Sequence, residues 1–423
     1  MPLLVIEYNR KGVWHIMTGR KKKSLRFKII TILIVLLVLA GGAFAFYWYT
    51  NPQIALNGDR EMTVTMKDGY TEPGATASFS FHDISEHIKI DSQVNDDKVG
   101  TYKVIYTVDY LDKTATAERT VNVIDKEPPE LTLTEGESIS LRPGEKFEDP
   151  GVTAIDDSDG DISDKVVSRG FVDTSCKGNY YILYDISDSY GNAASATRTV
   201  TVKGEPVGEV KGVIYLTFDD GPSTEVTAEI LDTLEEYEVP ATFFVIDYGT
   251  NQDKIKLMKR AIKDGCTIAI HGYSHDYSKI YASVPDFMDN ITKLHDKLKA
   301  DLNYDTQIIR FPGGSSNTVS KDYCKGIMTD LVKEIQIEGY KYVDWNVDST
   351  DASGNNVPVK KLIESVENNC DLEKANVILM HDSDAKKTTA KALPKIIEWA
   401  QEEGYEFRAI TMDSPAVHHK VNN

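Results

Sequence analysis

The chain has 423 residues, which is too long for one ordinary domain, and its formal net charge at pH 7 is −19. The charge is unevenly distributed: residues 1–28 hold eight Lys or Arg and one Glu, so the remaining residues carry a net charge of −26. This acidic remainder excludes nucleic acid as the partner of that part of the chain.

The first predicted element is a membrane-spanning helix. Residues 29–47 form an uncharged run of 19, and about 20 apolar residues are needed to cross a bilayer. Six basic residues between Arg20 and Lys28 precede the run. The positive-inside rule therefore predicts a cytoplasmic basic segment at 1–28, a membrane anchor at 29–49 and an extracellular remainder.

Two alternatives concern this N-terminal region. Ala43-Phe44-Ala45 fits the small-x-small form of a signal-peptide cleavage site, so a cleaved signal peptide is the alternative to the anchor. Residues 1–16 show no recognisable structure, and Met17 is an alternative start because Met17 to Lys28 forms a complete basic segment by itself.

An internal repeat follows the predicted anchor. Four segments recur at an offset of 77 to 79 residues: Pro52–Leu56 as Pro129–Leu133, Pro73–Ala75 as Pro150–Val152, Gly100–Tyr102 as Gly178–Tyr180, and Arg119–Val123 as Arg198–Val202. Alternation such as Tyr102, Val104, Tyr106 and Val108 is typical of half-buried antiparallel strands. The repeat predicts two all-β sandwiches, at 50–125 and 126–203, which resemble the Ig-like modules of bacterial cell-surface proteins.

The two modules are expected to act as a spacer between the membrane and the last domain. Glycan or wall binding is the alternative, although the sequence offers no exposed aromatic cluster to support it. Residues 204–210 are the expected linker to a last domain at 211–423.

Seven strand-like runs alternate with helical ones in the last domain. The runs are Val213–Phe218, Ala241–Ile246, Thr267–Ile270, Gln307–Phe311, Lys341–Val347, Asn376–Met380 and Glu406–Ile410. Between two of them, Ile255, Met258 and Ile262 have the spacing of one helix face, which ends at Gly265. The alternation predicts parallel strands with helices outside, and barrels of this kind carry their chemistry at the carboxyl ends of the strands.

Two adjacent carboxylates, Asp219 and Asp220, end the first of these strands. Side chains alternate along a strand, so one carboxylate can point to a metal and the other to a substrate water. Asp-Gly-Pro is also ordinary turn chemistry, so this pair alone does not distinguish a catalytic site from a turn.

Four further polar clusters follow later strands: His271 to His275, Arg310 to Gly314, Asp348 to Asp351, and Leu379 to His381. Two histidines with three residues between them, together with a carboxylate, supply the three ligands of a catalytic zinc-type site that keeps a position open for water. Taken alone, each cluster could serve only the structure, for example as a surface ion pair or a capping turn. Five clusters in order at strand ends favour an active site.

In this order the five motifs resemble those of the polysaccharide deacetylases, the NodB-homology domains of carbohydrate esterase family 4, over about residues 213–412. The resemblance implies an α/β domain folded as a distorted (β/α)7 barrel. It also implies a hydrolase that removes acetyl groups from N-acetylated or O-acetylated sugars with a divalent metal, usually zinc, with cobalt or nickel as alternatives.

The resemblance assigns a role to each site residue. Asp220, His271 and His275 are the expected metal ligands. Asp219 is the expected general base, oriented and kept ionised by Arg310. His381 is the expected general acid, stabilised by Asp351. The Gly313 N–H is the expected oxyanion donor, and Leu379 either lines the pocket beside the acetyl methyl group or is a buried strand leucine.

Two positions depart from the family pattern. The residue after the first histidine is usually Ser or Thr, whose hydroxyl braces the metal loop, but here it is Gly272, which puts the rigidity of that loop in doubt. The position after Asp351 is commonly Trp and here is Ala352, so one wall of the groove is open or rebuilt. Trp345 is expected in the core, on its strand.

The resemblance and the predicted anchor together favour N-acetylglucosamine of peptidoglycan as the substrate. Chitin-like oligomers, poly-N-acetylglucosamine and acetylated xylan are alternatives within the enzyme class. A catalytically silent glycan-binding protein is the alternative outside it, although the chain keeps every expected ligand and catalytic group. The four cysteines define no disulfide framework: Cys324 and Cys370 could pair across two barrel loops, whereas Cys176 and Cys266 are expected to be buried singly.

Overall fold

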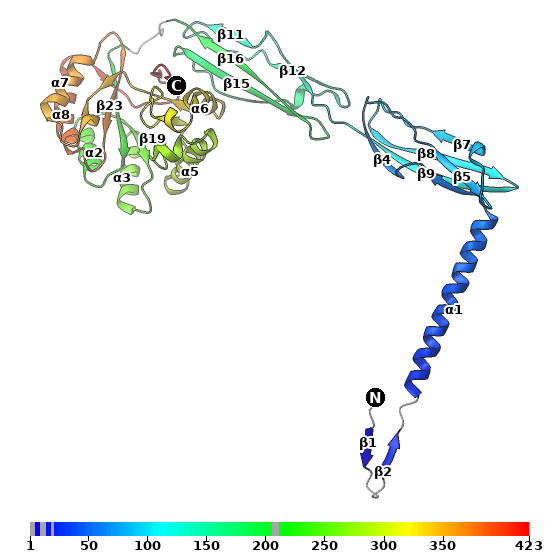
Figure 1. Cartoon of the computed structure of the whole chain (residues 1–423). Coiled ribbons are helices and arrows are strands. Elements are labelled where there is room, and N and C mark those ends of the chain that lie inside the picture. The colour runs from blue at the N-terminus through cyan, green and yellow to red at the C-terminus, as the bar shows by residue number, and fades with distance from the viewer. Residues whose placement is uncertain (1–4, 9–13, 18–20, 205–210, 423) are drawn as a thin grey trace. The chain divides into compact units, whose positions relative to one another are not determined.

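The computed structural model describes residues 5–8, 14–17, 21–204 and 211–422 (Figure 1). It divides into two compact units, residues 1–127 and 128–423. The expected linker at 204–210 lies, apart from Gly204, outside the described residues.

The first unit begins with a short antiparallel hairpin, β1 (Val5–Tyr8) and β2 (Trp14–Met17). The prediction of no structure in residues 1–16 is therefore wrong for these strands. A single helix, α1 (Lys21–Thr50), follows. Its segment Phe27–Thr50 is long and apolar enough to cross a membrane, and none of it is buried within the protein. The helix starts before the uncharged run because Lys and Arg are good helix formers.

The first Ig-like module, called module 1 below, consists of two sheets. One has the strand order β3-β5-β6 and the other the order β4-β9-β8-β7. The strands are β3 (Gln53–Leu56), β4 (Glu61–Thr65), β5 (Ala75–Phe79), β6 (His82–Asp83), β7 (Ile88–Ser92), β8 (Gly100–Tyr110) and β9 (Lys113–Ile124), with the 3-10 turn η1 (Ser85–His87) between β6 and β7. Val104, Tyr106 and Val108 of β8 are buried, as their alternation predicts.

The second Ig-like module, module 2, repeats this topology in the second unit. Its sheets have the orders β10-β12-β13 and β11-β16-β15-β14. The elements are β10 (Glu130–Leu133), β11 (Ser138–Leu141), β12 (Val152–Asp156), β13 (Gly160–Asp161), η2 (Ser163–Lys165), β14 (Val167–Arg169), β15 (Gly178–Ser187) and β16 (Ala193–Val202). The repeat therefore correctly predicts two sandwiches.

A fully buried arginine marks the same place in each module. The Arg119 guanidinium donates to the carbonyls of Asn57 and Gly74, and the Arg198 guanidinium donates to those of Thr134, Gly136 and Gly151. These bonds give each buried guanidinium backbone acceptors, and the Gly74 and Gly151 carbonyls also accept from the N–H groups of Asn57 and Thr134.

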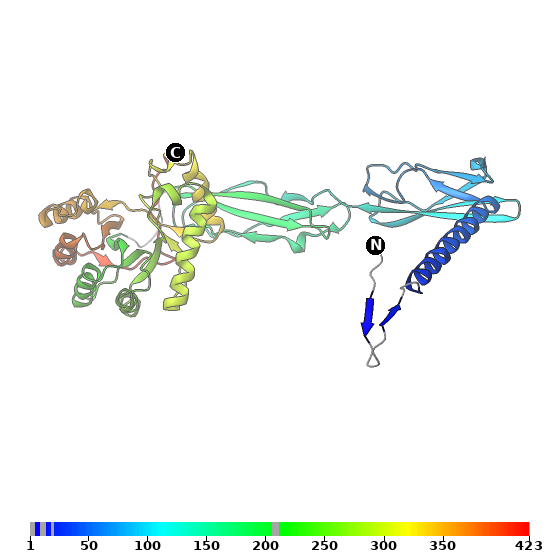
Figure 2. The ribbon, with the colours of Figure 1, turned by 60° about the horizontal axis from the view of Figure 1, so that its bottom comes forward.

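The last domain is built on a parallel sheet of the order β21-β20-β19-β18-β17-β23-β22, with β24 paired to the start of β17. Its strands are β17 (Val213–Gly221), β18 (Thr242–Ile246), β19 (Thr267–Gly272), β20 (Ile308–Ile309), β21 (Lys341–Tyr342), β22 (Val347–Asp348), β23 (Ala375–His381) and β24 (Glu406–Phe407). Helices cover the outer side of the sheet (Figures 1 and 2). They are α2 (Val226–Glu236), α3 (Gln252–Lys263), α4 (Tyr277–Ile280), α5 (Val284–Leu302), α6 (Ile327–Ile337), α7 (Val359–Asn369) and α8 (Lys387–Glu402), with η3 (Ser320–Asp322) and η4 (Asp351–Ser353) in loops.

One predicted strand, Lys341–Val347, is divided in two. β21 lies at one edge of the sheet and β22 at the opposite edge, and only residues 343–346 separate them. Four residues can connect the two edges of the sheet only if these edges lie close together. The sheet is therefore curled into a distorted barrel. Trp345 lies in this crossing and not on a strand; it is half-buried.

Side chains alternate between the barrel interior and the helix layer. On β17, Ile214, Leu216 and Phe218 belong to the large core under the helices, whereas Val213 and Tyr215 belong to a second core with Phe244, Ala269 and Val377. Continuing the alternation past Tyr215 puts Thr217 and Asp219 on the interior face.

All four cysteines are free, so the pairing of Cys324 with Cys370 that the sequence leaves open is not formed. Cys324 lies between β20 and α6, at the carboxyl ends of the strands, whereas Cys370 ends α7 and precedes β23, at the amino ends. The two loops are therefore at opposite ends of the barrel, which sequence spacing does not reveal. Cys176 and Cys266 are buried, as expected.

Candidate active site

Asp219 and Asp220 diverge because β17 is irregular where it ends. Its register with β18 shifts between Asp219 and Gly221, and Asp220 adopts a φ of 71°. Asp219 thus stays on the interior face while Asp220 turns away from it. Gly221 leaves no room for a side chain, because the buried Asp382 carboxyl occupies the space of a Cβ atom there.

Three predicted ligands converge on one point. Asp220 Oδ1 lies 3.6 Å from His271 Nε2 and 3.6 Å from His275 Nε2. Ligand atoms around a tetrahedral zinc, at bonds of about 2.0–2.1 Å, are themselves about 3.4 Å apart. Asp220 Oδ1 is buried and has no hydrogen-bond partner in the described part of the chain, so its lone pairs are available to a cation. The donor set therefore fits a zinc-type divalent metal.

The tautomer of His271 suits a ligand. Its Nδ1 lies 2.9 Å from the carbonyl oxygen of Arg310, which can only accept, so Nδ1 carries the hydrogen and Nε2 presents a lone pair. Burial lowers the pKa of His271 despite the nearby carboxylates of Asp219 and Asp220, so the ring is neutral at pH 7.

The loop after His271 is held by Asn290 of α5. Asn290 Oδ1 accepts from Ser274 N at 2.6 Å, and its backbone carbonyl accepts from Tyr273 N at 3.2 Å. Gly272 has a φ of 143°, and a Cβ there would lie 2.5 Å from Asn290 Nδ2. The absence of a Ser or Thr hydroxyl at position 272 is thus accompanied by a different brace, an amide from a neighbouring helix.

Arg310 is fully buried inside the barrel and holds Asp219. Its Nη1 donates to Asp219 Oδ1 at 2.8 Å and to Thr217 Oγ1 at 2.7 Å. Nε and Nη2 donate to the carbonyls of Val343 and Asp344, and the guanidinium lies 4.1 Å from the centre of the Phe244 ring. This arrangement leaves Asp219 Oδ2 uncommitted to Arg310, 3.8 Å from His271 Nε2.

The predicted turn at Gly313 lies beside the ligand loop. Gly313 has a φ of 78°, and a Cβ on it would lie 2.5 Å from the hydroxyl of Tyr277, whose ring packs on His275 at 5.2 Å. No acceptor among the described residues bonds to the Gly313 N–H. Burial, with the nearby Asp220 charge, raises the pKa of Tyr277 to about 12, so it remains a neutral hydroxyl.

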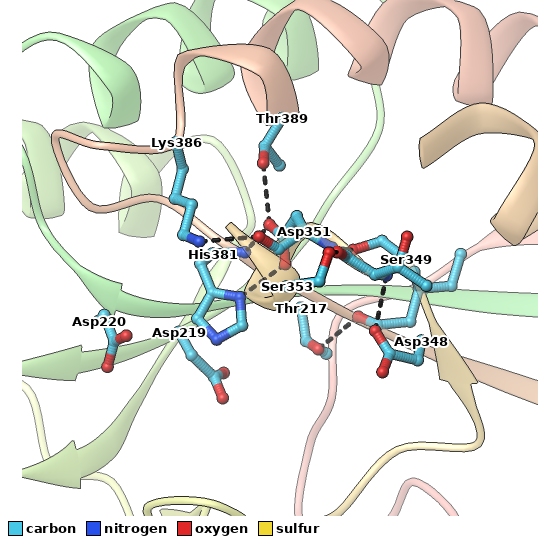
Figure 3. A network of polar contacts seen from close by, with 12 residues as sticks. Thr217, Asp219, Asp220, Asp348, Ser349, Asp351, Ser353, His381, Lys386 and Thr389 are labelled. Atoms are coloured by element: carbon cyan, nitrogen blue, oxygen red, sulfur yellow. Dashed lines mark hydrogen bonds and ion pairs between the residues drawn. The ribbon is translucent and has the colours of Figure 1, made fainter. Parts of the chain in front are cut away.

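His381 faces Asp219 from the neighbouring strand. β17 and β23 pair Asp219 with His381 and Thr217 with Leu379, which brings the predicted base and acid together by register alone. Leu379, two residues before His381, is buried on the same face of β23. Figure 3 shows Asp219, Asp220 and His381 gathered at these strand ends.

A buried carboxylate supports His381 from behind (Figure 3). Asp351 Oδ1 lies 2.7 Å from His381 Nδ1, and Asp351 Oδ2 accepts from His381 N and from Thr389 Oγ1 at 2.8 Å each. Burial alone would lower the pKa of His381, but the hydrogen bond and charge of Asp351, with the charges of Asp219 and Asp220, raise it to about 9. His381 is therefore protonated at neutral pH, with Nε2 free to donate.

Several residues that complete the site were not predicted from the sequence: Asn290, Tyr277, Asp382, Lys386 and Thr389. Lys386 Nζ donates to the carbonyl of Asp351 at 2.8 Å, which fixes the turn that carries this carboxylate. None of these five residues lies within the five sequence motifs, so the spacing of the motifs could not predict them. Asp348, in contrast, lies inside a motif but only caps its own turn by accepting from Thr350 N.

Comparison with known proteins identifies the family. A family model for polysaccharide deacetylase matches residues 207–327. YheN of Bacillus subtilis, whose name assigns it to the polysaccharide deacetylases, is 33% identical over 208 residues, which are 48% of this chain and 69% of YheN. A peptidoglycan-N-acetylglucosamine deacetylase of Bacillus cereus is 31% identical over 219 residues, 51% of this chain and 74% of that protein. The chain belongs to the polysaccharide deacetylase family.

Two further matches concern the catalytic domain and the modules. A solved structure, the catalytic domain of a peptidoglycan N-acetylglucosamine deacetylase from Eubacterium rectale, is 42% identical with a TM-score of 0.48, and the match covers 52% of this chain and 98% of that one. A model for the Ig-like domain of bacterial surface proteins matches residues 54–123 and 131–202. This polysaccharide deacetylase is thus a hydrolase of amide bonds preceded by two surface-type modules, as the sequence motifs predict.

Proposed function

We propose that this deacetylase removes the N-acetyl group from N-acetylglucosamine of peptidoglycan, with a zinc ion held by Asp220, His271 and His275. The observation that carries the proposal is the buried Asp220 Oδ1, which lacks a hydrogen-bond partner among the described residues and lies 3.6 Å from each of two histidine nitrogens. Cobalt or nickel would accept the same nitrogen and oxygen ligands.

The bound cation would supply a water that ionises near neutral pH and a positive charge for the acetyl carbonyl. In this proposal Asp219 accepts the proton of the attacking water through Oδ2, because Oδ1 is engaged by Arg310. Arg310 is the positioning residue for this base. Three other acceptors, Thr217 Oγ1 and the carbonyls of Val343 and Asp344, fix its guanidinium, which in turn fixes the Asp219 carboxylate.

The Gly313 N–H donates to the oxyanion that develops on the acetyl oxygen. Support comes from its lack of any other acceptor in the described chain and from its place beside Tyr277 and the ligand loop. A backbone donor needs no rearrangement during the reaction, which is why such groups stabilise oxyanions well.

His381 donates its Nε2 proton to the departing amine, and Asp351 stabilises the imidazolium before that transfer. Leu379 contacts the acetyl methyl group from the same face of β23. Because Asp219 and His381 are paired residues of adjacent strands, base and acid approach the amide from neighbouring positions.

The choice of peptidoglycan is supported by the activity that the name of the similar Bacillus cereus protein states and by the surface-type modules. Beside the fourth motif, a cavity of about 540 Å³ is lined by Trp345, Asp348, Thr350 and His419, among others. Trp345 thus presents an aromatic side chain in this cavity, which Ala352 does not line. Chitin-like oligomers, poly-N-acetylglucosamine and acetylated xylan remain the competing substrates.

We further propose that α1 anchors the enzyme in the cell membrane with residues 1–28 inside the cell and the modules and catalytic domain outside. The length and hydropathy of Phe27–Thr50 and the basic residues before it support this topology. In this arrangement the modules act as a spacer. A cleaved signal peptide would leave the same domains outside the cell but unanchored.

Acetate release by the purified full chain tests the proposal. Peptidoglycan, chitin oligomers and acetylxylan are offered in parallel to zinc-loaded protein, with Asp219→Asn and His381→Gln as separate variants. Release from peptidoglycan that both substitutions abolish is the expected result. Zinc content and circular dichroism of each variant serve as controls, because Asp219→Asn leaves the buried Arg310 charge unpaired. No release from any polymer by folded, zinc-loaded protein would favour a silent glycan-binding protein.

A further inference from the structure

Two hairpin turns of module 1 expose large apolar side chains. Phe81, in the turn between β5 and β6, is 88% exposed, and Leu111, in the turn between β8 and β9, is 68% exposed. Outside α1 these are the two most exposed large hydrophobic residues in the described part of the chain.

The backbone conformation of both turns makes large apolar residues unusual at these positions. Ser80, Phe81, Leu111 and Asp112 all have positive φ, between 46° and 69°, which is the conformation of tight two-residue hairpin turns. Asn, Asp and Gly are the residues that adopt this conformation at least cost. Neither the turn geometry nor contact with water therefore accounts for Phe81 and Leu111.

Both turns lie at the end of module 1 where α1 arrives. Ser80 Oγ donates to the Tyr49 carbonyl at 2.6 Å, and the rings of Tyr49 and Phe81 are 6.2 Å apart. Lys113 Nζ, beside the second turn, donates to the carbonyl of Thr50. The register agrees, because Gln53, three residues after α1 ends, pairs with Ser78 of β5.

The two turns are also next to each other. The rings of Phe79 and Tyr110, one residue before each turn, lie 5.4 Å apart. Phe81 and Leu111 are therefore carried on neighbouring tips beside the end of α1, whose last residues include the aromatic belt Tyr47-Trp48-Tyr49. Aromatic belts of this kind lie at the membrane–water interface.

The repeat supplies an internal comparison. In module 2 the turn between β12 and β13 is Asp157-Ser158-Asp159 in place of Ser80-Phe81. The turn between β15 and β16 is Asp188 to Asn192, which is polar except for the half-exposed Tyr190. Module 1 follows the apolar helix α1 and has two apolar turns. Module 2 follows no such helix, and its matching turns lack this pair of apolar side chains.

We propose that this end of module 1 rests on the lipid surface, with Phe81 and Leu111 inserted into the interfacial region of the bilayer that α1 spans. The inference rests on the proposed membrane anchor and adds a second, peripheral contact to it. Amphipathic elements of this kind bury their apolar side chains about 5–10 Å into the headgroup and acyl boundary. Module 1 would then stand on the bilayer in one orientation and would not swing on a flexible tether.

Depth-dependent fluorescence quenching tests the inference on the full chain in phosphatidylglycerol–phosphatidylcholine liposomes. Phe81→Cys and Leu111→Cys are labelled with a polarity-sensitive fluorophore in a background in which the half-buried Cys324 and Cys370 are alanine. Asp97→Cys, exposed in the loop before β8, and Ser158→Cys, in the matching turn of module 2, are the controls. β8 runs from Gly100 to Tyr110, a length of roughly 33 Å, and Asp97 lies before its start whereas Leu111 follows its end.

Quenching by nitroxide-labelled lipid is expected to be roughly threefold or more stronger for the labels at positions 81 and 111 than for those at 97 and 158. A label at Tyr49→Cys is expected to be quenched as strongly. Quenching at Tyr49→Cys without quenching at 81 and 111 would overturn the docking and leave the anchor intact. Absence of quenching at all three sites would overturn the anchor itself. Protection of 81 and 111 from an aqueous quencher without lipid quenching would mean that protein, not lipid, covers the tips, and would also overturn the inference.

Discussion

His381 keeps its proton at neutral pH because of Asp351. The imidazole is largely buried, which by itself favours the neutral ring, yet the carboxylate 2.7 Å away raises its pKa to about 9. Asp219 and Asp220 contribute to the same shift. A cation bound by Asp220 would cancel part of that contribution, so the pKa of His381 in the metal-loaded enzyme should lie between its ordinary value and 9.

The pH profile of turnover tests this role. A general acid works only when protonated, so the rate should fall as pH rises through the pKa of His381. Asp351→Asn removes the stabilising charge and should move this alkaline limb down by about one to two pH units, with a lower maximum rate. Thr389→Val, which removes only a neutral donor to Asp351, should move it much less. An alkaline limb that stays in place in Asp351→Asn would contradict the assignment.

The element that holds the metal loop is α5. Its Asn290 side chain satisfies the backbone N–H of Ser274 between the two ligand histidines, and the same side chain fills the space beside Gly272. The loop is therefore fixed by packing between a helix and a strand-end turn rather than by a hydroxyl within the motif.

Removing this brace should weaken metal binding. Asn290→Ala leaves the half-buried Ser274 N–H without its acceptor and removes the amide beside Gly272, and it is expected to reduce zinc affinity by about 10- to 100-fold. Gly272→Ala should act in the same direction because a methyl group would collide with Asn290. Lys293→Ala, on an exposed position of the same helix, is the matched control, and competition with a chromogenic chelator measures the affinity. Equal zinc affinity in Asn290→Ala and Lys293→Ala would refute the brace.

The spacing of apolar and polar residues predicted those elements whose pattern depends on a single strand or helix. α3 follows the spacing of Ile255 and Met258 and ends before Gly265, and the five motifs fall at the carboxyl ends of strands. The division of Lys341–Val347 between β21 and β22 depends on barrel closure, a property of the whole sheet. Asn290 reaches the site from α5 and Lys386 from the residue just before α8, so no sequence spacing relates them to the motifs.

At the scale of the whole chain, module 2 is packed against the catalytic domain within one compact unit. Lys341, whose side chain is 2% exposed, pairs with Asp173 of module 2 at 2.8 Å and donates to the Met412 carbonyl. The C-terminal segment continues to His419, whose N–H donates to Asp344 Oδ2, and the Asp344 carbonyl accepts from Arg310. Module 2 is thus connected by contacts to the residue that orients the proposed base.

A chain that begins at Lys211 should consequently be less stable than one that begins at Pro128. Truncation removes Asp173 together with the rest of module 2, so the barrel loses this contact and the Lys341 ammonium is opened to water. Substitution of Asp173 alone leaves the ammonium buried without its charged partner, which costs about 3–5 kcal/mol. Asp173→Asn in the longer chain should reproduce much of this loss, whereas Asp164→Asn, in the η2 turn of the same module, should not. Urea denaturation measures the difference, and equal stability of the two chains would show that the contact contributes nothing.

The most direct test of the central claim is to titrate the metal-stripped full chain with zinc while following acetate release from peptidoglycan. If Asp220, His271 and His275 form the catalytic metal site, activity should rise in proportion to added zinc and reach its plateau at one equivalent, and His275→Ala should need a large excess. Full activity in stripped protein with chelator present, or tight zinc binding without any acetate release, would contradict the account.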